Sequence, residues 1–174
     1  VASLGAKFVA VEDDEFKQAE TAAGYAKPMS AEYQAKQAAL VASHIAKQDI
    51  VITTALIPGR PAPKLVSEEM VKSMRAGSVI IDLAVERGGN VALSKAGETI
   101  VTENGVTILG PLNLPGRIAA SASALYAKNL FAFLETMIDK KEKTLAPHWD
   151  DELVKATLLT RDGSVIHPNF QPKS

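Results

Sequence analysis

The chain has 174 residues, of which 47% are apolar, and its 19 basic and 20 acidic residues give a net charge of −1. A chain of this length can bury a core of its own, and its balanced charge excludes the basic surface typical of nucleic-acid-binding proteins. The absence of cysteine excludes disulfides, thiolate metal sites and a cysteine nucleophile. The three histidines stand in no zinc-binding pattern, and no apolar run approaches the roughly 18 residues of a membrane span. We therefore expect neither a metal site nor a nucleic-acid partner.

The N-terminal stretch predicts a strand and a long helix. Leu4 followed by Gly5 is typical of the end of a helix, and the apolar residues 7–11 predict a short strand. Ser30 is a suitable N-cap for a helix over residues 31–47, where apolar positions recur at helical spacing. Because the chain opens on the end of a helix and has no initiator methionine, we expect it to be part of a longer polypeptide.

Two buried strands of a parallel sheet are predicted in the middle of the chain. Residues 50–54 and 78–82 are apolar and β-branched, without the polar alternation of a strand that faces solvent. Ser67, followed by two glutamates, predicts the start of a helix that runs to Met74. A strand–helix–strand order of this kind is typical of parallel sheets.

Further strands and a long helix are predicted after this unit. Residues 99–102 and 106–109 predict strands joined by an Asn-Gly turn. The alanine- and leucine-rich residues 119–138 predict the longest helix, and residues 153–160 and 164–166 predict a β-hairpin around an Asp-Gly turn. The chain as a whole predicts an α/β fold, a Rossmann-like doubly wound parallel sheet followed by a long helix and a β-hairpin.

Three loops are candidates for a ligand site. Those that follow Thr54, Asp82 and Gly110 leave the sheet at the carboxyl ends of their strands, where open α/β sheets bind ligands. Their glycines and prolines permit close approach to a flat ligand, although α/β loops need such residues in any case. Asp82 is a candidate to hold a sugar hydroxyl or to orient a neighbouring loop, and equally to cap the following turn.

Three other side chains have competing interpretations. Glu86, beside Arg87, is a candidate acid/base group or a member of an exposed ion pair. Tyr25 is a candidate aromatic tip of a lid or a surface tyrosine, and Arg117 is a candidate phosphate ligand or a cap for the long helix. No G-x-G-x-x-G, Walker A or nucleophile-elbow motif is present. Residue patterns therefore lead to the ligand-binding half of an α/β sheet domain and no further.

Four motifs resemble the NAD(H)-binding component, domain I, of proton-translocating nicotinamide nucleotide transhydrogenase. They are GYAKPM (residues 24–29), TTALIPGRPAPK (53–64), GSVIIDLAVE with GGN (77–86 and 88–90), and LPGR with NL (114–117 and 129–130). The likeness extends from Leu4 to about Pro168. The alanine dehydrogenase family is also similar, but this chain has Glu86 where those enzymes carry a catalytic aspartate.

The resemblance implies that residues 1–118 form the C-terminal half of an NAD-binding Rossmann-like domain. Residues 119–174 would be a connecting helix and hairpin that pack on a second subdomain, whose N-terminal part is absent. In the strand order 3-2-1-4-5-6, residues 7–11 would be the third strand and residues 50–54 the fourth. The two strands between them, and the glycine-rich turn and acidic ribose-binding residue of family members, would have to come from the upstream half of the domain.

The resemblance also implies which residues contact the cofactor. Gly24 and Tyr25 belong to a mobile loop that closes over the nucleotide. Gln37, on the helix that follows, is an expected NAD(H) contact, as are Ala55 and Leu56 at the end of a strand. No catalytic side chain and no metal ligand are implied.

The function implied is hydride transfer from NADH to NADP⁺, the latter bound on a partner domain, coupled to proton translocation by a membrane domain. Family members form homodimers on the cytoplasmic side, peripheral to the inner membrane, or on the matrix side in mitochondria. Two alternatives stay open, an NAD-dependent alanine dehydrogenase and a non-catalytic nucleotide-binding or assembly module. Direct hydride transfer needs no acid or base, whereas an amino-acid dehydrogenase must also move protons.

Overall fold

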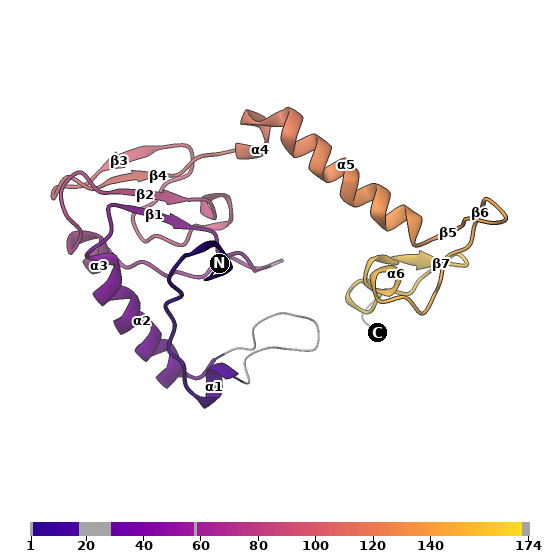
Figure 1. Ribbon diagram of the computed structural model, residues 1–174, viewed down its shortest axis with the longest axis horizontal. Coiled ribbons are helices and arrows are strands. Elements are labelled where there is room, and N and C mark those ends of the chain that lie inside the picture. Colours follow the sequence, from indigo (N-terminus) through magenta and orange to yellow (C-terminus); the bar gives the residue numbers. More distant parts are fainter. Residues whose placement is uncertain (1, 18–28, 58, 172–174) are drawn as a thin grey trace. The chain divides into compact units, whose positions relative to one another are not determined.

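The computed structural model describes residues 2–17, 29–57 and 59–171. They fall into two compact units, Val1–Leu112 and Asn113–Ser174, and Figure 1 labels the elements of both. No helix in the described ranges is both long and apolar enough to cross a membrane.

The N-terminal unit contains a four-stranded sheet in the order β1-β2-β4-β3. The strands are β1 (Ile50–Thr53), β2 (Val79–Asp82), β3 (Thr99–Val101) and β4 (Thr107–Leu109). β1, β2 and β4 run parallel, and β3 pairs antiparallel with β4. The α/β class and the parallel core predicted from the apolar runs are therefore confirmed.

Two serines begin the longer helices of this unit. The helices are η1 (Ala2–Leu4), α1 (Asp14–Lys17), α2 (Ala31–Ile45), α3 (Glu68–Lys72) and η2 (Val85–Arg87). The Ser30 hydroxyl accepts a hydrogen bond from the Tyr33 N–H at 3.1 Å. The Ser67 hydroxyl accepts one from the Met70 N–H at 3.2 Å. Both serines are N-caps, as predicted, although each helix ends two residues before its predicted end.

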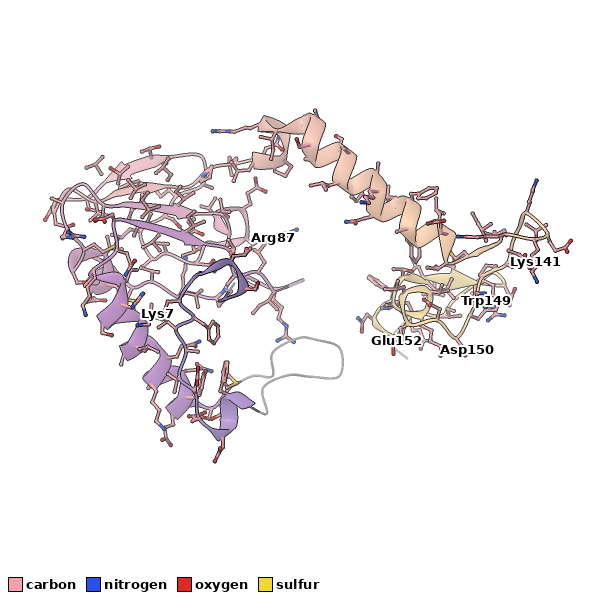
Figure 2. The ribbon with its side chains drawn as sticks, in the orientation of Figure 1. Lys7, Arg87, Lys141, Trp149, Asp150 and Glu152 are labelled. Atoms are coloured by element: carbon pink, nitrogen blue, oxygen red, sulfur yellow. The ribbon has the colours of Figure 1, made fainter. Side chains whose placement is uncertain are left out.

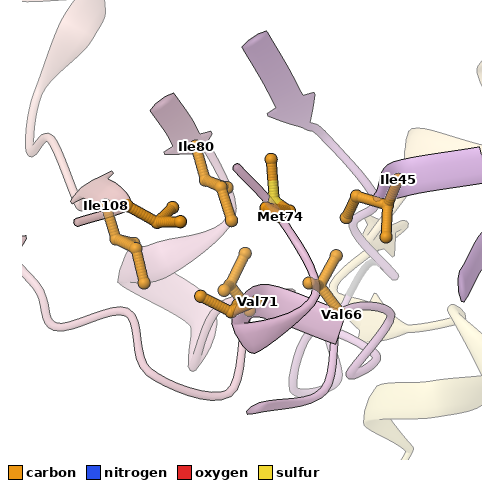
Figure 3. Close-up of a cluster of buried hydrophobic side chains, with 8 residues drawn as sticks. Ile45, Val66, Val71, Met74, Ile80 and Ile108 are labelled. Atoms are coloured by element: carbon orange, nitrogen blue, oxygen red, sulfur yellow. The ribbon is translucent and has the colours of Figure 1, made fainter. Parts of the chain in front are cut away.

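The buried core lies between the sheet and helices α2 and α3, which lie on the same side of the sheet in Figure 1. Ile80 of β2 and Ile108 of β4 lie close to Val71 of α3 (Figure 3). Burying a valine or isoleucine side chain contributes roughly 1.5–3 kcal/mol, so this face of the sheet holds the unit together. The buried cluster consists of Ile45, Val66, Val71, Met74, Ile80, Val91, Val106 and Ile108.

The opposite face of the sheet is also apolar, and no helix of the described N-terminal unit contributes a buried cluster to it. Val51 packs against the core, and side chains alternate along a strand. Ile50 and Ile52 therefore lie on the other face, where they are 65% and 59% exposed. Ile81 of β2 pairs with Ile52 in register and shares that face. This surface is free to receive another segment.

β1 also has an open edge. The carbonyl oxygens of Asp49 and Thr53 accept hydrogen bonds from N–H groups of the β2 side at 2.8 and 2.9 Å. Because backbone groups of alternate residues point to opposite sides of a strand, the N–H and C=O groups of Ile50 and Ile52 point away from β2. Among the described residues, β1 has β2 as its one strand neighbour.

The predicted strand at residues 7–11 is wrong, because no strand forms there. A strand needs a partner for its backbone groups, and no strand of the described sheet pairs with this segment. The segment instead contacts α2, where the Tyr33 hydroxyl donates a hydrogen bond to the Val11 carbonyl at 3.2 Å.

The C-terminal unit consists of short elements and one long helix. They are α4 (Leu114–Arg117), α5 (Ala119–Glu135), β5 (Ile138–Asp139), β6 (Thr144–Leu145), α6 (Glu152–Thr157), β7 (Thr160–Arg161), β8 (Ser164–Val165) and η3 (Pro168–Phe170). The long helix is confirmed, but it ends at Glu135 because the chain then enters the β5–β6 hairpin. No side chain of α5 is buried. Trp149, labelled in Figure 2, has the Arg161 guanidinium 4.1 Å from its ring centroid.

The predicted first strand of the C-terminal hairpin is largely wrong. The Asp151 carboxylate accepts hydrogen bonds from the N–H groups of Leu153 and Val154 at 2.8 and 3.1 Å, and so begins α6. The hairpin itself is confirmed over β7 and β8. Asp162 and Gly163 at its turn have φ values of 50° and 77°, as a type I′ turn requires.

Candidate functional site

The carboxyl ends of β1 and β2 lie side by side, because Thr53 pairs with Asp82 in register. The Thr53 hydroxyl donates a hydrogen bond to Asp82 Oδ1 at 3.1 Å. Both strands end toward the side where Figure 2 labels Arg87, whose carbonyl accepts a hydrogen bond from the Ala62 N–H at 2.8 Å. The loops that follow the two strands therefore meet at one edge of the sheet, as the parallel order predicts.

Asp82 organises this edge. Its side chain is fully buried, with 0% of its surface exposed. Its carboxylate accepts hydrogen bonds from the hydroxyls of Thr53 and Ser94 at 3.1 and 2.6 Å and from the backbone N–H groups of Ala84, Asn90 and Val91 at 3.0, 2.9 and 3.1 Å. These donors come from β1, from the turn after β2 and from the loop beyond the turn.

The pKa of Asp82 lies below its ordinary value. Burial alone would raise the pKa of this carboxyl, but the hydrogen bonds from Ser94, Val91, Asn90 and Ala84 outweigh burial and lower it. The carboxylate is therefore ionised at neutral pH and is already surrounded by donors. Of the interpretations left open by the sequence, the structure supports the one in which Asp82 caps the following turn and orients the neighbouring loop.

Asn90 links the two strand ends. Its Oδ1 accepts a hydrogen bond from the Ala55 N–H at 2.9 Å, and its Nδ2 donates to the carbonyls of Ala55 and Pro63 at 2.9 and 2.8 Å. The side chain is fully buried. One amide thus holds the Ala55 peptide groups and both ends of the proline-rich loop that follows β1. The sequence assigned no contact to Asn90, and an asparagine that follows two glycines is too common a pattern to have revealed this role.

Two glycines at this edge are required by packing. Gly89 has a φ of 76°, and a Cβ there would lie 2.5 Å from Asp82 Oδ2. A Cβ on Gly110 would collide with the carbonyl oxygen of Lys95. The glycine that ends β4 therefore serves the close approach of two backbone segments.

The loop that follows η2 is tied down further by Lys64. Its Nζ donates hydrogen bonds to the carbonyl of Gly88 and, at 3.5 Å, to that of Val91. A lysine that bonds to carbonyl groups is drawn along the loop instead of projecting freely into solvent. The sequence did not single out this role for Lys64.

The predicted site residues Ala55 and Leu56 stand directly after β1. Ala55 is half-buried and held by Asn90. Leu56 and Ile57 are 55% and 45% exposed. The structure therefore places apolar side chains toward solvent at the carboxyl edge of the sheet, on backbone that is fixed from below.

Gln37 lies elsewhere in the same unit. It is an exposed residue of α2 and lines a cavity of about 730 Å³ between α2 and β1. Val51 and Thr53 of β1 also line the cavity, whereas Ala55 and Leu56 do not. The structure thus brings Gln37 to the open side of β1 without bringing it to the Ala55–Leu56 step.

Gly24 and Tyr25, predicted to close over the nucleotide, lie outside the described residues. Glu86 is an exposed residue of η2, and Arg117 is an exposed residue of α4 in the C-terminal unit. No group of three potential metal ligands gathers within the ranges that the structure describes.

The residues at the sheet edge fit one side of a dinucleotide. Sites for such ligands combine apolar surface for the rings with a few fixed polar groups. Leu56 and Ile57 supply exposed apolar surface, and the buried network of Asp82 and Asn90 fixes the backbone beneath them. Asp82 has no need of a further donor, so it does not serve as the ribose ligand.

Comparison with known proteins places this geometry in a family. Residues 1–168 match the family model described as the C-terminal domain of alanine dehydrogenase/PNT. The chain is 56% identical to the first of the polypeptides that make up the NAD(P) transhydrogenase alpha subunit of Rhodospirillum rubrum. The match extends over 168 residues, which are 97% of this chain and 44% of that protein. The chain therefore spans less than half the length of this relative.

Solved structures agree. The crystal structure of transhydrogenase from Sinorhizobium meliloti is 60% identical, with a TM-score of 0.69 over 95% of this chain and 41% of that one. An L-alanine dehydrogenase structure is 30% identical, with a TM-score of 0.54 over 76% of this chain and 37% of that one. The chain belongs to the alanine dehydrogenase/PNT family and carries that family's C-terminal domain.

Proposed function

We propose that this chain is part of the NAD(H)-binding component of a proton-translocating NAD(P) transhydrogenase, which transfers a hydride from NADH to NADP⁺. The observation that carries the proposal is the 56% identity to a transhydrogenase alpha subunit over 97% of the chain. The alanine dehydrogenase likeness is weaker and covers less of the chain.

The site geometry supports this reaction. When bound, the nicotinamide ring supplies the hydride chemistry, and the task of the chain is to orient that ring. The apolar step at Leu56 and Ile57 offers a surface for a flat ring, and the fixed backbone beneath it limits the orientations that the ring adopts. Asp82, buried in the network, is saturated with hydrogen bonds and is not available to move a proton.

The proposed contacts with NAD(H) come from two regions. Ala55 and Leu56 at the sheet edge and Gln37 on α2 contact the nucleotide, and Gly24 and Tyr25 close over it. The resemblance of the GYAKPM and TTALIPGRPAPK motifs to transhydrogenase domain I supports these assignments. If Tyr25 belongs to the closing loop, Tyr25→Ala will speed the release of NADH in stopped-flow measurements and leave the unfolding transition unchanged.

The first partner that we propose is the upstream half of the same domain. It supplies a parallel strand that pairs with the open edge of β1, and its elements cover the exposed face of Ile50 and Ile52. Residues 1–118 then complete an NAD-binding Rossmann-like domain, and residues 119–174 pack on a second subdomain. The exposed apolar side chains of α5, which include Leu125, Tyr126 and Phe131, support such packing.

The remaining partners follow from the proposed reaction. They are an NADP(H)-binding domain and a membrane domain that translocates protons, in a complex built on a homodimer. The chain would lie on the cytoplasmic side, peripheral to the inner membrane, or on the matrix side in mitochondria. The designation of relatives as portions of a subunit supports assembly with other components.

Isotope transfer tests the reaction. The protein that contains this chain and the upstream half is combined with the NADP(H)-binding component and supplied with NADH deuterated at the nicotinamide C4 position. We expect deuterium to reach NADPH without loss to water, and no NADH to form from alanine and NAD⁺. Formation of NADH from alanine would instead support an alanine dehydrogenase, and nucleotide binding without either reaction would support a non-catalytic module.

A further inference from the structure

Asn90 spends every hydrogen-bonding atom of its side chain on the loop that carries the proposed nucleotide contacts. Its Oδ1 accepts from the Ala55 N–H, and its Nδ2 donates to the Ala55 and Pro63 carbonyls. Because one side chain both accepts from and donates to Ala55, it imitates the pairing of a neighbouring strand and extends the ordered part of β1.

The support behind Asn90 is as complete as its grip on Ala55. The Asn90 N–H donates to Asp82 Oδ2 at 2.9 Å. Its carbonyl accepts hydrogen bonds from the N–H groups of Leu65 and Val66 at 2.8 and 3.0 Å. A continuous set of bonds therefore runs from the end of β2, through Asn90, to the residue just before Leu56.

Direct contact between Asn90 and a nucleotide does not fit this arrangement. The residue has 0% of its surface exposed, and both its Oδ1 and its Nδ2 already have partners. Any effect of Asn90 on a ligand has to pass through the backbone that it holds. Groups that fix the residues of a site in this way reduce the ordering that binding would otherwise require.

We propose that Asn90 is a positioning residue for NAD(H), acting through the Ala55 peptide to present Leu56 at the sheet edge. This inference rests on the proposed function. It adds a buried residue that makes no contact with the nucleotide to the set that determines NADH affinity.

The chain offers a matched control at the other end of the sheet. The Nδ2 of Asn104 donates to the carbonyls of Val71, Lys72 and Met74 at 3.2, 3.3 and 3.2 Å, at the end of α3. Asn90→Asp and Asn104→Asp are each nearly isosteric, and each replaces a donor to carbonyl groups by a carboxylate that repels them. Both variants should lose stability, but only the first disturbs the candidate site.

The experiment measures NADH binding and transhydrogenation in the complete protein, with the upstream half present. We expect Asn90→Asp to weaken NADH binding about tenfold or more and to raise the KM for NADH more than it lowers kcat. Asn104→Asp should leave both values within about twofold of wild type. Equal loss of affinity in the two variants, or unchanged affinity in Asn90→Asp, would overturn the inference.

A double-mutant cycle with Leu56→Ala separates positioning from a general structural role. If Asn90 acts by presenting Leu56, the effect of Asn90→Asp on NADH affinity will shrink in the Leu56→Ala background. Additive effects would contradict the inference. If Asn90→Asp does not fold, Asn90→Ser, which keeps one donor, is carried through the same cycle. A wild-type protein that fails to bind NADH would contradict the proposed function itself, and the inference would fall with it.

Discussion

The Asn90 N–H donates a hydrogen bond to Asp82 Oδ2 at 2.9 Å, and neither side chain is accessible to solvent. Asp82 ends β2, whereas Asn90 holds a residue that follows β1. This single bond therefore couples the ends of two parallel strands, so a change at either residue is felt at the edge where the ligand is proposed to bind.

Asp82→Asn should destabilise the N-terminal unit by more than about 2 kcal/mol, since hydrogen bonds to charged groups contribute roughly 1.5–3 kcal/mol each. The new amide NH₂ would face donors such as the Ser94 hydroxyl and the Val91 N–H. Urea unfolding at neutral pH measures the loss. A variant as stable as wild type would show that the network contributes little.

The same pair of proteins tests the pKa of Asp82. Because its pKa is lower in the folded state than the ordinary value of about 3.9, the carboxylate stabilises the fold above that value. The contribution is lost as the pH falls from about 3.9 through the lowered folded-state pKa. The difference in unfolding free energy between wild type and Asp82→Asn should therefore be constant near neutrality and shrink below about pH 4. A difference that grows toward acid would contradict the assignment.

Gly89→Ala should be more destabilising than Gly88→Ala, although both glycines have positive φ values, 76° and 95°. Placing alanine in the left-handed region costs roughly 1–2 kcal/mol at either position. At Gly88 the added Cβ meets open space, whereas at Gly89 it meets Asp82 Oδ2 at 2.5 Å. Thermal unfolding of the two variants separates the collision from the backbone strain. Equal losses would mean that Asp82 moves aside without penalty.

Sequence patterns predicted the parts of the fold that depend on local chemistry. Ser30 and Ser67 were identified as N-caps because a hydroxyl before a helix has few other uses. The apolar run of β2 could only suit a strand buried in a sheet. The segment at residues 7–11 failed because strand formation depends on a partner, which no property of the segment itself reveals.

The candidate site was predictable in position but not in detail. The parallel order placed the loops after β1 and β2 together without any knowledge of their contacts. The partners of Asp82 and Asn90 depend on how distant segments meet, 35 residues apart in the case of Asn90 and Ala55. The C-terminal hairpin shows the same limit, because Asp151 captured the chain into α6 before the predicted strand could begin.

Ile52→Pro should separate the stability of this chain from its assembly with the upstream half. The Ile52 N–H points to the open edge of β1 and pairs with no described strand, so its loss costs the isolated chain little ladder bonding. A parallel strand added at that edge would lose a hydrogen bond and meet the proline ring. We expect co-purification with the upstream half to fall sharply. Ile52→Thr, which keeps the N–H and the β-branch, should still assemble, and assembly by the proline variant would argue against pairing at this edge.

Leu56→Asp should weaken NADH binding, because it places a charge against an apolar ring in the proposed contact. Removing an apolar contact and desolvating a carboxylate together should cost at least about 2 kcal/mol, or roughly 30-fold in affinity. Leu56 is 55% exposed, so the fold should tolerate the change. Val101→Asp is the control: Val101 is 68% exposed and pairs with Thr107, where β4 begins, at the opposite end of the sheet. If both variants bind NADH like wild type in isothermal titration, Leu56 is not a contact, and the Asn90 inference loses the residue through which it acts.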